Sequence, residues 1–233
     1  MKNYFIKEGY HHKKEARTSV DEGTQYWSDS RLTSSKYYQY DVYKLARNLI
    51  KKNNFETCAD VGCGSGYKLA NIISPACNHA TGIDQPFIID RCKEVYSNKN
   101  IEWVSDDFEN PHNTFDRKFD AIICSDVIEH LIDPDVLLNY IKSIAHKDSL
   151  IIISTPERDM LSGEDNNEAV NGEHIREWNQ SELVKYLEHS GFCVDEVKLL
   201  KPVKFHFSRR FFRPFLQKGK NFNYCMTIVC RLA

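Results

Sequence analysis

Short apolar runs alternate with amphipathic segments along most of the chain. The apolar runs predict seven strands, at residues 57–61, 80–84, 101–104, 119–124, 150–156, 194–200 and 224–231. Apolar residues at helical spacing predict helices at residues 37–52, 67–73 and 133–142, and a last helix from residue 179 that ends before Gly191. Strands that alternate with helices are typical of an α/β domain with a mostly parallel sheet.

Two of these helices begin with specific signals. Asp133 is suited to be an N-cap and Pro134 to be a first helical residue. Asn179 and Glu182 have the spacing of a capping box. The polar segment 157–178 before that box is too long for an ordinary connection, so we expect it to be functional or disordered.

Both ends of the chain depart from the alternation. Residues 1–35 are polar and irregular, and Tyr26 and Trp27 within them either close over a ligand or pack this leader onto the domain. Near the other end, residues 204–220 carry six basic residues and five phenylalanines with no acid. We read that stretch either as a solvated insertion or as a contact for a phosphorylated acceptor or a membrane surface.

Composition narrows the class of protein. The 233 residues contain 31 Lys and Arg against 33 Asp and Glu, so overall charge gives no reason to expect nucleic acid as a partner. The N-terminus lacks the apolar core of a signal peptide, and no apolar run approaches the ~20 residues of a membrane helix. Five of the eight cysteines (Cys58, Cys124, Cys193, Cys225 and Cys230) fall in or beside predicted strands and none forms a Cys-x-x-Cys pair, which indicates reduced thiols. We therefore expect a cytoplasmic protein.

A glycine-rich turn follows the first predicted strand, in the pattern Asp60-x-Gly62-x-Gly64-x-Gly66. Glycine reaches positive φ freely and lets a ligand lie against bare backbone. The spacing differs from the Gly-x-Gly-x-x-Gly of dinucleotide enzymes, which argues against an NAD-linked oxidoreductase. A carboxylate at the strand end would repel a pyrophosphate, whereas it would attract a cationic amino group.

Further acids follow the next two strands. Asp84 ends the second strand 22 residues after Gly62, where a carboxylate accepts hydrogen bonds from the two hydroxyls of a ribose; a simple strand-end cap is the alternative. Asp106 and Asp107 follow the third strand, where an acid accepts from an adenine amino group. Residue spacing alone does not separate these two.

Three stretches resemble class I S-adenosylmethionine-dependent methyltransferases. They are residues 60–66, residues 119–134 with Asp126-Val127-Ile128-Glu129-His130-Leu131, and residues 174–178 before the capped helix. The resemblance extends roughly over residues 41–231. It implies a Rossmann-like α/β three-layer sandwich whose seven-stranded sheet has the order 3-2-1-4-5-7-6 with strand seven antiparallel. One domain, 1–233, would comprise a leader and lid helix (1–52), a cofactor-binding core (55–200), and the basic aromatic loop with the last strand (201–233).

The resemblance also implies roles for residues. Asp60 would hold the ammonium of S-adenosylmethionine, Asp84 its ribose and Asp107 its adenine, and Ser125 and Asp126 would border the methyl group and the acceptor. Asp107 is favoured because the order Asp-Phe-Glu resembles the family's adenine-binding turn. The full cofactor-binding set is Asp60, Gly62, Cys63, Gly64, Gly66, Asp84, Gln85, Asp107, Phe108 and Ser125. The product would be S-adenosylhomocysteine.

The candidate catalytic residues are His130, His174 and Asp126. A hydroxyl acceptor must lose its proton, and a positioned histidine can remove it; a structural histidine bonded to backbone is the alternative. Asp126, Glu129, His130 and His174 also resemble the metal-binding set of small-RNA 2′-O-methyltransferases, with Asp where that family has Glu. Because Glu-His-Leu occurs in metal-free relatives too, we expect no metal and keep these four residues as the alternative ligand set.

The expected function is O-methylation of a small molecule, or of a sugar or glycan that is phosphorylated or lipid-linked, as in the tailoring of cell-surface polysaccharides. The alternatives are a quinone or phenol O-methyltransferase, a metal-assisted RNA 2′-O-methyltransferase and a protein that binds the cofactor without catalysis. Nucleic acid is disfavoured, peripheral membrane contact would go through residues 204–220, and the protein is expected to be a monomer or homodimer.

Overall fold

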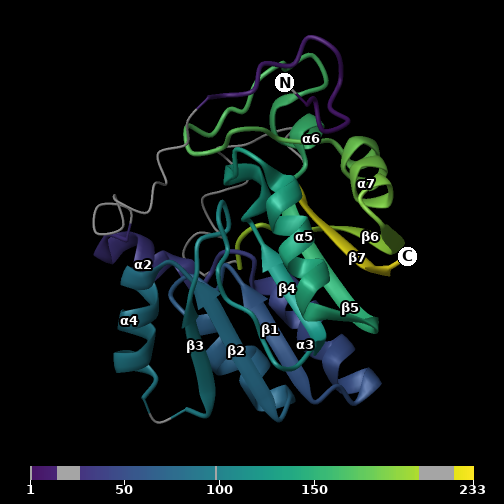
Figure 1. The fold of residues 1–233 in the computed structure, drawn as a ribbon. Helices are drawn as coiled ribbons and strands as arrows, with labels where there is room; N and C mark the ends of the chain where they lie inside the picture. The colour runs from purple at the N-terminus through teal and green to yellow at the C-terminus, as the bar shows by residue number, and fades with distance from the viewer. Residues whose placement is uncertain (1, 15–26, 98, 205–222) are drawn as a thin grey trace.

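A computed structural model of the chain describes residues 2–14, 27–97, 99–204 and 223–233 (Figure 1). Its strands form one seven-stranded sheet in the order β3-β2-β1-β4-β5-β7-β6. They are β1 (Thr57–Val61), β2 (His79–Asp84), β3 (Ile101–Ser105), β4 (Phe119–Ser125), β5 (Ala145–Pro156), β6 (Phe192–Leu200) and β7 (Cys225–Leu232). The first five strands pair in parallel and β7 is antiparallel to both of its neighbours. The fold class and strand order are therefore confirmed.

Helices cover both faces of the sheet. They are α2 (Asp29–Ser35), α3 (Tyr40–Asn53), α4 (Pro86–Val95), α5 (Pro134–Ile144), α6 (Arg158–Ser162) and α7 (Gln180–His189), with a π-helical turn, η2, at Leu69–Ile73. Apolar residues of α5 and α7 pack with one face of the sheet, and those of α3, η2 and α4 with the other. In Figure 1, α5 lies in front of the sheet and α3 behind it.

The period of two along each strand decides which face a side chain meets. In β1, Ala59 and Val61 join the apolar cluster on the α5 face, whereas Cys58 joins the cluster on the α3 face. Asp60 shares the parity of Cys58, so its carboxyl group points to the α3 face. There the hydroxyl of Tyr43, from α3, reaches it.

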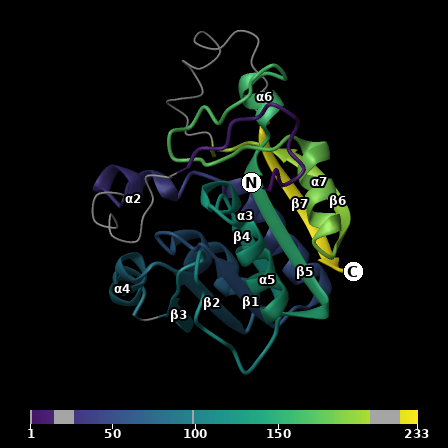
Figure 2. The ribbon, with the colours of Figure 1, turned by 45° about the horizontal axis from the view of Figure 1, so that its top comes forward.

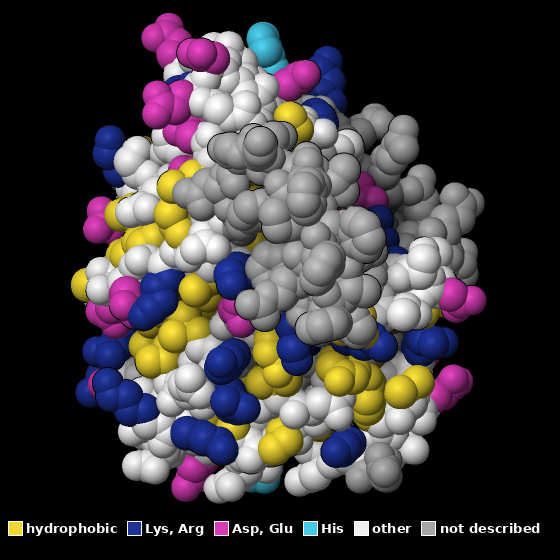
Figure 3. All heavy atoms as spheres, turned by 180° about the vertical axis from the view of Figure 1, so that it is seen from behind, with side chains coloured by type: hydrophobic (Ala, Val, Ile, Leu, Met, Phe, Trp, Pro, Cys, Tyr) yellow, Lys and Arg dark blue, Asp and Glu magenta, His cyan; other side chains and the backbone are white. Residues whose placement is uncertain are grey.

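The outer surface of α3 is basic. Lys44, Lys51 and Lys52 are exposed on this helix, while Val42, Tyr43, Ala46 and Ile50 are buried beneath it. Figure 3, seen from the α3 side of the molecule, shows lysine and arginine side chains among hydrophobic ones. Exposed charge over a buried apolar stripe is the usual arrangement of a surface helix.

The two capping signals predicted from the sequence are confirmed, whereas the helix predicted from residue 37 begins at Tyr40. The Asp133 side chain accepts from the amide of Asp135, and Asn179 and Glu182 form the reciprocal capping box. The strand at residues 150–156 is longer than expected, because β5 begins at Ala145 and runs through polar residues that the apolar pattern excluded. Helices α2 and α4 do not appear among the helices predicted from apolar spacing.

Residues 2–14 contain no helix or strand, as the irregular sequence of the leader predicts, but they are packed against the domain. Tyr4, Ile6 and Tyr10 are buried in the core on the α5 face. Beside it lies the segment 157–178, joined by bonds from the amides of His11 and Lys13 to carbonyl groups of that segment at 2.7 and 3.0 Å. Figure 2 shows the two segments side by side.

The segment 157–178 is therefore ordered, so the disordered alternative for it is wrong. Arg158 is almost fully buried and donates to both carboxylate oxygens of Glu182, at 2.7 and 3.1 Å. Trp178 is fully buried and donates to the carbonyl of Tyr4 at 3.0 Å. Across the described ranges no helix is both long and apolar enough to cross a membrane, and all eight cysteines are free thiols.

Candidate active site

The glycine turn is held closely between the ends of neighbouring strands. Gly62 has φ +83°, and a Cβ there would lie 2.2 Å from Cγ2 of Val127, which follows β4. Gly66 has φ +70°, and a Cβ there would lie 2.6 Å from the ring of Trp103 on β3. Both positions therefore require glycine for the positive φ and for close packing. The role of Gly66 is at least in part to admit Trp103, which the sequence did not indicate.

Asp60 is fully buried at the end of β1. Its Oδ1 accepts from the Tyr43 hydroxyl at 2.9 Å, while its Oδ2 has no hydrogen-bond partner among the described residues. Burial raises the pKa of Asp60 to about 7, although the bond from Tyr43 and the charge of Lys68 oppose this rise. A buried carboxylate oxygen without a partner is unfavourable, so this atom fits the predicted site for an ammonium group.

Asp84 connects the glycine turn to the end of β2. Its Oδ2 accepts from the amide of Gly64 at 2.7 Å and its Oδ1 from the amide of Gln85 at 2.8 Å. Burial raises the pKa of Asp84 to about 6. Each carboxylate oxygen can accept more than one bond, so the carboxylate can cap the strand and still accept from ribose hydroxyls. The two alternatives for Asp84 are thus compatible.

The structure separates Asp106 from Asp107. Asp106 is buried and accepts from the amides of Asp107, His112 and Asn113 at 3.0, 2.9 and 3.2 Å, so its carboxylate organises the loop. Asp107 is only half-buried and accepts from the amide of Glu109 at 3.0 Å. This supports Asp107 as the adenine-binding acid, which stays a prediction together with Phe108.

Trp27 lies against the glycine turn. A Cβ at Gly64 would stand 3.1 Å from its indole ring. The helix that follows it, α2, is joined to the same turn by a 2.6 Å bond between the hydroxyls of Ser35 and Ser65. Its Arg31 pairs with Glu173 of the segment 157–178. Tyr26 lies outside the described residues.

Ser125 and Asp126 stand at the carboxyl end of β4. The Ser125 hydroxyl bonds that of Ser154 on β5 at 2.7 Å. Asp126 has φ +55°, and its carboxylate accepts from the amide group of Gln39 and, at 3.4 Å, from Ser154. Burial raises the pKa of Asp126 to about 6. Both side chains therefore already have protein partners, which favours a positioning role.

His130 and His174 lie together but differ in their bonding. Their ring centroids are 4.8 Å apart in an edge-to-face arrangement. Nδ1 of His130 lies 2.8 Å from the carbonyl oxygen of Glu173 and must donate to it, which leaves Nε2 as the nitrogen with a lone pair. His174 bonds Glu177 through Nδ1 at 2.7 Å and Asn171 through Nε2 at 2.9 Å. Burial lowers the pKa of His130 to about 4, so its ring is neutral. The geometry thus favours His130 over His174 as the base.

Glu129 is fully buried beside this pair. Neither of its carboxylate oxygens has a hydrogen-bond partner among the described residues. Burial, with the nearby carboxyl groups of Asp126 and Glu177, raises the pKa of Glu129. Glu129, His130 and His174 each offer one ligand atom, and these three atoms lie within 4.8 Å of one another. Three of the four residues in the alternative metal set are thus brought together, and a carboxylate with two imidazoles suits a divalent transition metal.

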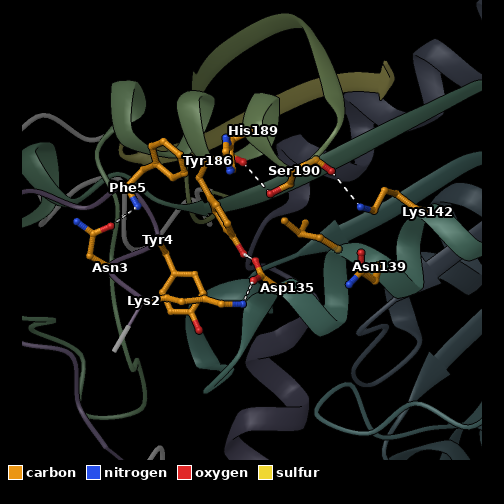
Figure 4. Close-up of a pocket in the computed structure, with 11 residues that line it drawn as sticks. Lys2, Asn3, Tyr4, Phe5, Asp135, Asn139, Lys142, Tyr186, His189 and Ser190 are labelled. Atoms are coloured by element: carbon orange, nitrogen blue, oxygen red, sulfur yellow. Dashed lines mark hydrogen bonds and ion pairs between the residues drawn. The ribbon is translucent and has the colours of Figure 1, made fainter.

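A separate cavity of about 550 Å³ lies between the N-terminal segment, α5 and α7 (Figure 4). Its charged groups are engaged with the protein: Asp135 accepts from Lys2 and from the Tyr186 hydroxyl, each at 2.6 Å. Lys142 donates to the carbonyl of Ser190 at 3.0 Å. None of the residues predicted for catalysis or cofactor binding lines it.

The carboxyl edge of the sheet therefore carries the candidate site, and comparison with known proteins decides the family. A family model described as a methyltransferase domain matches residues 35–197. The chain belongs to this methyltransferase family. Solved structures of the same fold are described as S-adenosylmethionine-dependent methyltransferases, which agrees with the cofactor that the resemblance implied.

Among curated proteins, ubiquinone biosynthesis O-methyltransferases are similar to part of this chain. A ubiquinone biosynthesis O-methyltransferase of Actinobacillus pleuropneumoniae serotype 7 (strain AP76) is 30% identical over 106 residues, which are 42% of this chain and 45% of that protein. The chain spans less than half the length of the curated relatives that it matches.

Solved structures show the same fold at lower identity. A putative methyltransferase in complex with the Haloferax volcanii Trm112 methyltransferase activator has a TM-score of 0.70 at 14% identity, covering 92% of this chain and 97% of that one. The N-methyltransferase NodS from Bradyrhizobium japonicum WM9, solved with S-adenosyl-l-homocysteine, has a TM-score of 0.58 at 12% identity, covering 82% and 86%.

The raised pKa of Asp60 predicts pH-dependent cofactor binding. Only the ionised carboxylate attracts an ammonium group, so affinity should be full above the pKa of about 7 and fall as pH drops through it. From about pH 8 to about pH 6 we expect the Kd for S-adenosylhomocysteine to rise roughly tenfold. Asp60→Asn should bind weakly and lose this dependence between pH 8 and the pKa of Asp84. Calorimetry in two buffers of different ionisation enthalpy measures both affinity and proton release. A wild-type Kd that is flat over this range contradicts the assignment.

Proposed function

We propose that this methyltransferase methylates a phenolic hydroxyl group of a small molecule. The proposal rests on His130, which follows β4. Its ring is neutral, and the bond from Nδ1 to the carbonyl group of Glu173 leaves a lone pair on Nε2. The partial likeness to ubiquinone biosynthesis O-methyltransferases supports the same class of acceptor. Of the alternatives stated from the sequence, quinone or phenol methylation is therefore preferred to the glycan.

The cofactor residues have separate tasks in this proposal. S-adenosylmethionine, when bound, supplies a methyl group activated by the sulfonium. The free Oδ2 of Asp60 accepts from its amino group, Asp84 accepts from the ribose hydroxyls and Asp107 from the adenine amino group. Orienting the acceptor and the methyl carbon in this way can lower a barrier by on the order of 7–11 kcal/mol at best.

His130 takes the acceptor's proton at Nε2. With a pKa of about 4 it is a weak base, and a weak base removes a proton more readily from the more acidic of two hydroxyl groups. A phenol, with a pKa of about 10 like that of tyrosine, gives up its proton far more readily than a sugar hydroxyl. The low basicity of His130 therefore favours a phenolic acceptor.

The glycan acceptor expected from the sequence stays a prediction. None of the similar proteins named above is described as acting in polysaccharide synthesis. Residues 205–222, which carry most of the basic aromatic stretch behind the phosphorylated-acceptor and membrane proposals, lie outside the described residues. The expected cytoplasmic location and the monomer or homodimer stay predictions.

Acceptor class can be tested by transfer of radiolabelled methyl. We expect label to enter a catechol such as 3,4-dihydroxybenzoate carrying an alkyl chain, and not a nucleotide-sugar or RNA. His130→Asn should lower kcat by ~10²–10⁴-fold while its affinity for S-adenosylhomocysteine stays unchanged. His79→Asn, at the exposed amino end of β2, is the matched control. Label found only in sugar or RNA, or normal turnover by His130→Asn, would refute the proposal.

A second candidate is the same reaction assisted by a divalent cation, and the buried carboxyl group of Glu129 favours it. A cation held by Glu129, His130 and His174 would lower the pKa of an acceptor hydroxyl bound to it.

This candidate predicts one Mn²⁺ or Zn²⁺ site per chain by calorimetry. Glu129→Gln should remove the site without loss of folding stability, because it replaces a buried carboxyl group by a neutral amide. The control is Glu102→Gln on β3, whose carboxylate is partly exposed. Full turnover in excess chelator, with no metal bound, would leave His130 as the only proton acceptor.

A further inference from the structure

Lys68 is a basic side chain turned toward the interior beside the cofactor site. It lies two residues after Gly66, the last glycine of the turn, and is the N-cap residue of η2. Its Nζ donates to the carbonyl oxygen of Ser35 at 3.1 Å and lies 4.8 Å from the centre of the Tyr43 ring. It is thus held between the end of α2 and a residue of α3.

The charges around Lys68 are those of the site. Burial lowers the pKa of Lys68, while the nearby carboxyl groups of Asp60 and Asp126 oppose this change. In turn, the positive charge of Lys68 opposes the rise in the pKa of Asp60. One bond to the Ser35 carbonyl uses one of the three hydrogens on its ammonium group, which leaves two to donate.

The amino-acid end of S-adenosylmethionine needs both signs of charge. It carries an ammonium and a carboxylate on the same carbon atom. Asp60 offers a free oxygen to the first, and a carboxylate drawn into the same buried space requires a cation there. We propose that Lys68 binds the carboxylate of the amino-acid end of S-adenosylmethionine while Asp60 binds its amino group.

Tyr43 sets the two charged groups relative to each other. Its hydroxyl donates to Oδ1 of Asp60 at 2.9 Å, and its ring faces Nζ of Lys68. Burial raises the pKa of Tyr43, so it remains a donor. Ser35 fixes Lys68 from the other side, and its hydroxyl bonds Ser65 in the glycine turn at 2.6 Å. The carboxylate site is therefore built from α2, α3 and the turn together.

A pair of ligands tests this assignment without any acceptor. Decarboxylated S-adenosylmethionine keeps the amine, the sulfonium and the adenosine but lacks the carboxylate. Wild-type protein should bind S-adenosylmethionine roughly 10–100-fold more tightly than the decarboxylated compound, as expected for a charge-assisted hydrogen bond. In Lys68→Met the affinity for S-adenosylmethionine should fall by that factor and the affinity for the decarboxylated compound should stay nearly constant.

Two variants act as controls in the same calorimetric experiment. Lys44→Met, on the exposed face of α3, should change neither affinity. Asp60→Asn should weaken both ligands, because both carry the amine. Lys68→Arg should keep part of the preference, and it replaces Lys68→Met if thermal melting shows that the methionine variant does not fold.

Three results would overturn the proposal. Equal weakening of both ligands in the Lys68 variants would mean that Lys68 only balances the charge of Asp60 and Asp126. If wild-type protein binds the two compounds equally well, nothing in the site recognises the carboxylate. If wild-type protein binds neither compound, the assignment of the cofactor site is wrong. The acceptor proposed above plays no part in these measurements, so its failure would be recognised separately by the turnover assay.

Discussion

A buried carboxylate with one unpaired oxygen is the constraint on which this site depends. Strand periodicity turns Asp60 away from the α5 face and toward α3, where Tyr43 satisfies only one of its two oxygens. Burial raises the pKa of Asp60, and in our proposal a cationic ligand completes the other oxygen. Lys68 carries the opposite charge nearby. On this proposal the glycine pattern is one part of a recognition site for an amino acid, which would explain why an acid precedes it.

The residues proposed for the cofactor and those proposed for the acceptor lie at the carboxyl ends of β1, β2 and β4. The glycine turn is tied to β2 through Asp84 and packed against Val127 beyond β4. The same β4 terminus carries Asp126, Glu129 and His130, so the residues proposed to act on the acceptor follow the strand whose end packs against the glycine turn. Helix α2 contacts the glycine turn through Ser35 and the segment 157–178 through Arg31. The two sets of residues lie close together because the carboxyl ends of parallel strands meet at one edge of the sheet.

Local patterns predicted the fold well because they act through neighbouring residues. Caps and apolar runs predicted the seven strands and the main helices, apart from α2, α4 and α6, whereas the strand order came from the resemblance to a known family. Long-range partners left no such pattern. Nothing near His130 in the sequence indicates that the carbonyl of Glu173 fixes its tautomer, or that His174 is engaged on both ring nitrogens. Asp106 is distinguished from Asp107 by its deeper burial and by the three loop amides that donate to it. The carbonyl group of Ser35, which Lys68 donates to, is 33 residues away in the sequence.

The central claim is that the turn after β1 is built for a cofactor with a positively charged amino-acid end. Its most direct test is a calorimetric titration of the purified protein with S-adenosylmethionine, S-adenosylhomocysteine and NAD. Micromolar binding of the first two, with no heat from NAD, is the result expected from Asp60 and the glycine spacing. Binding of NAD, or silence from the two adenosyl amino acids, would contradict it.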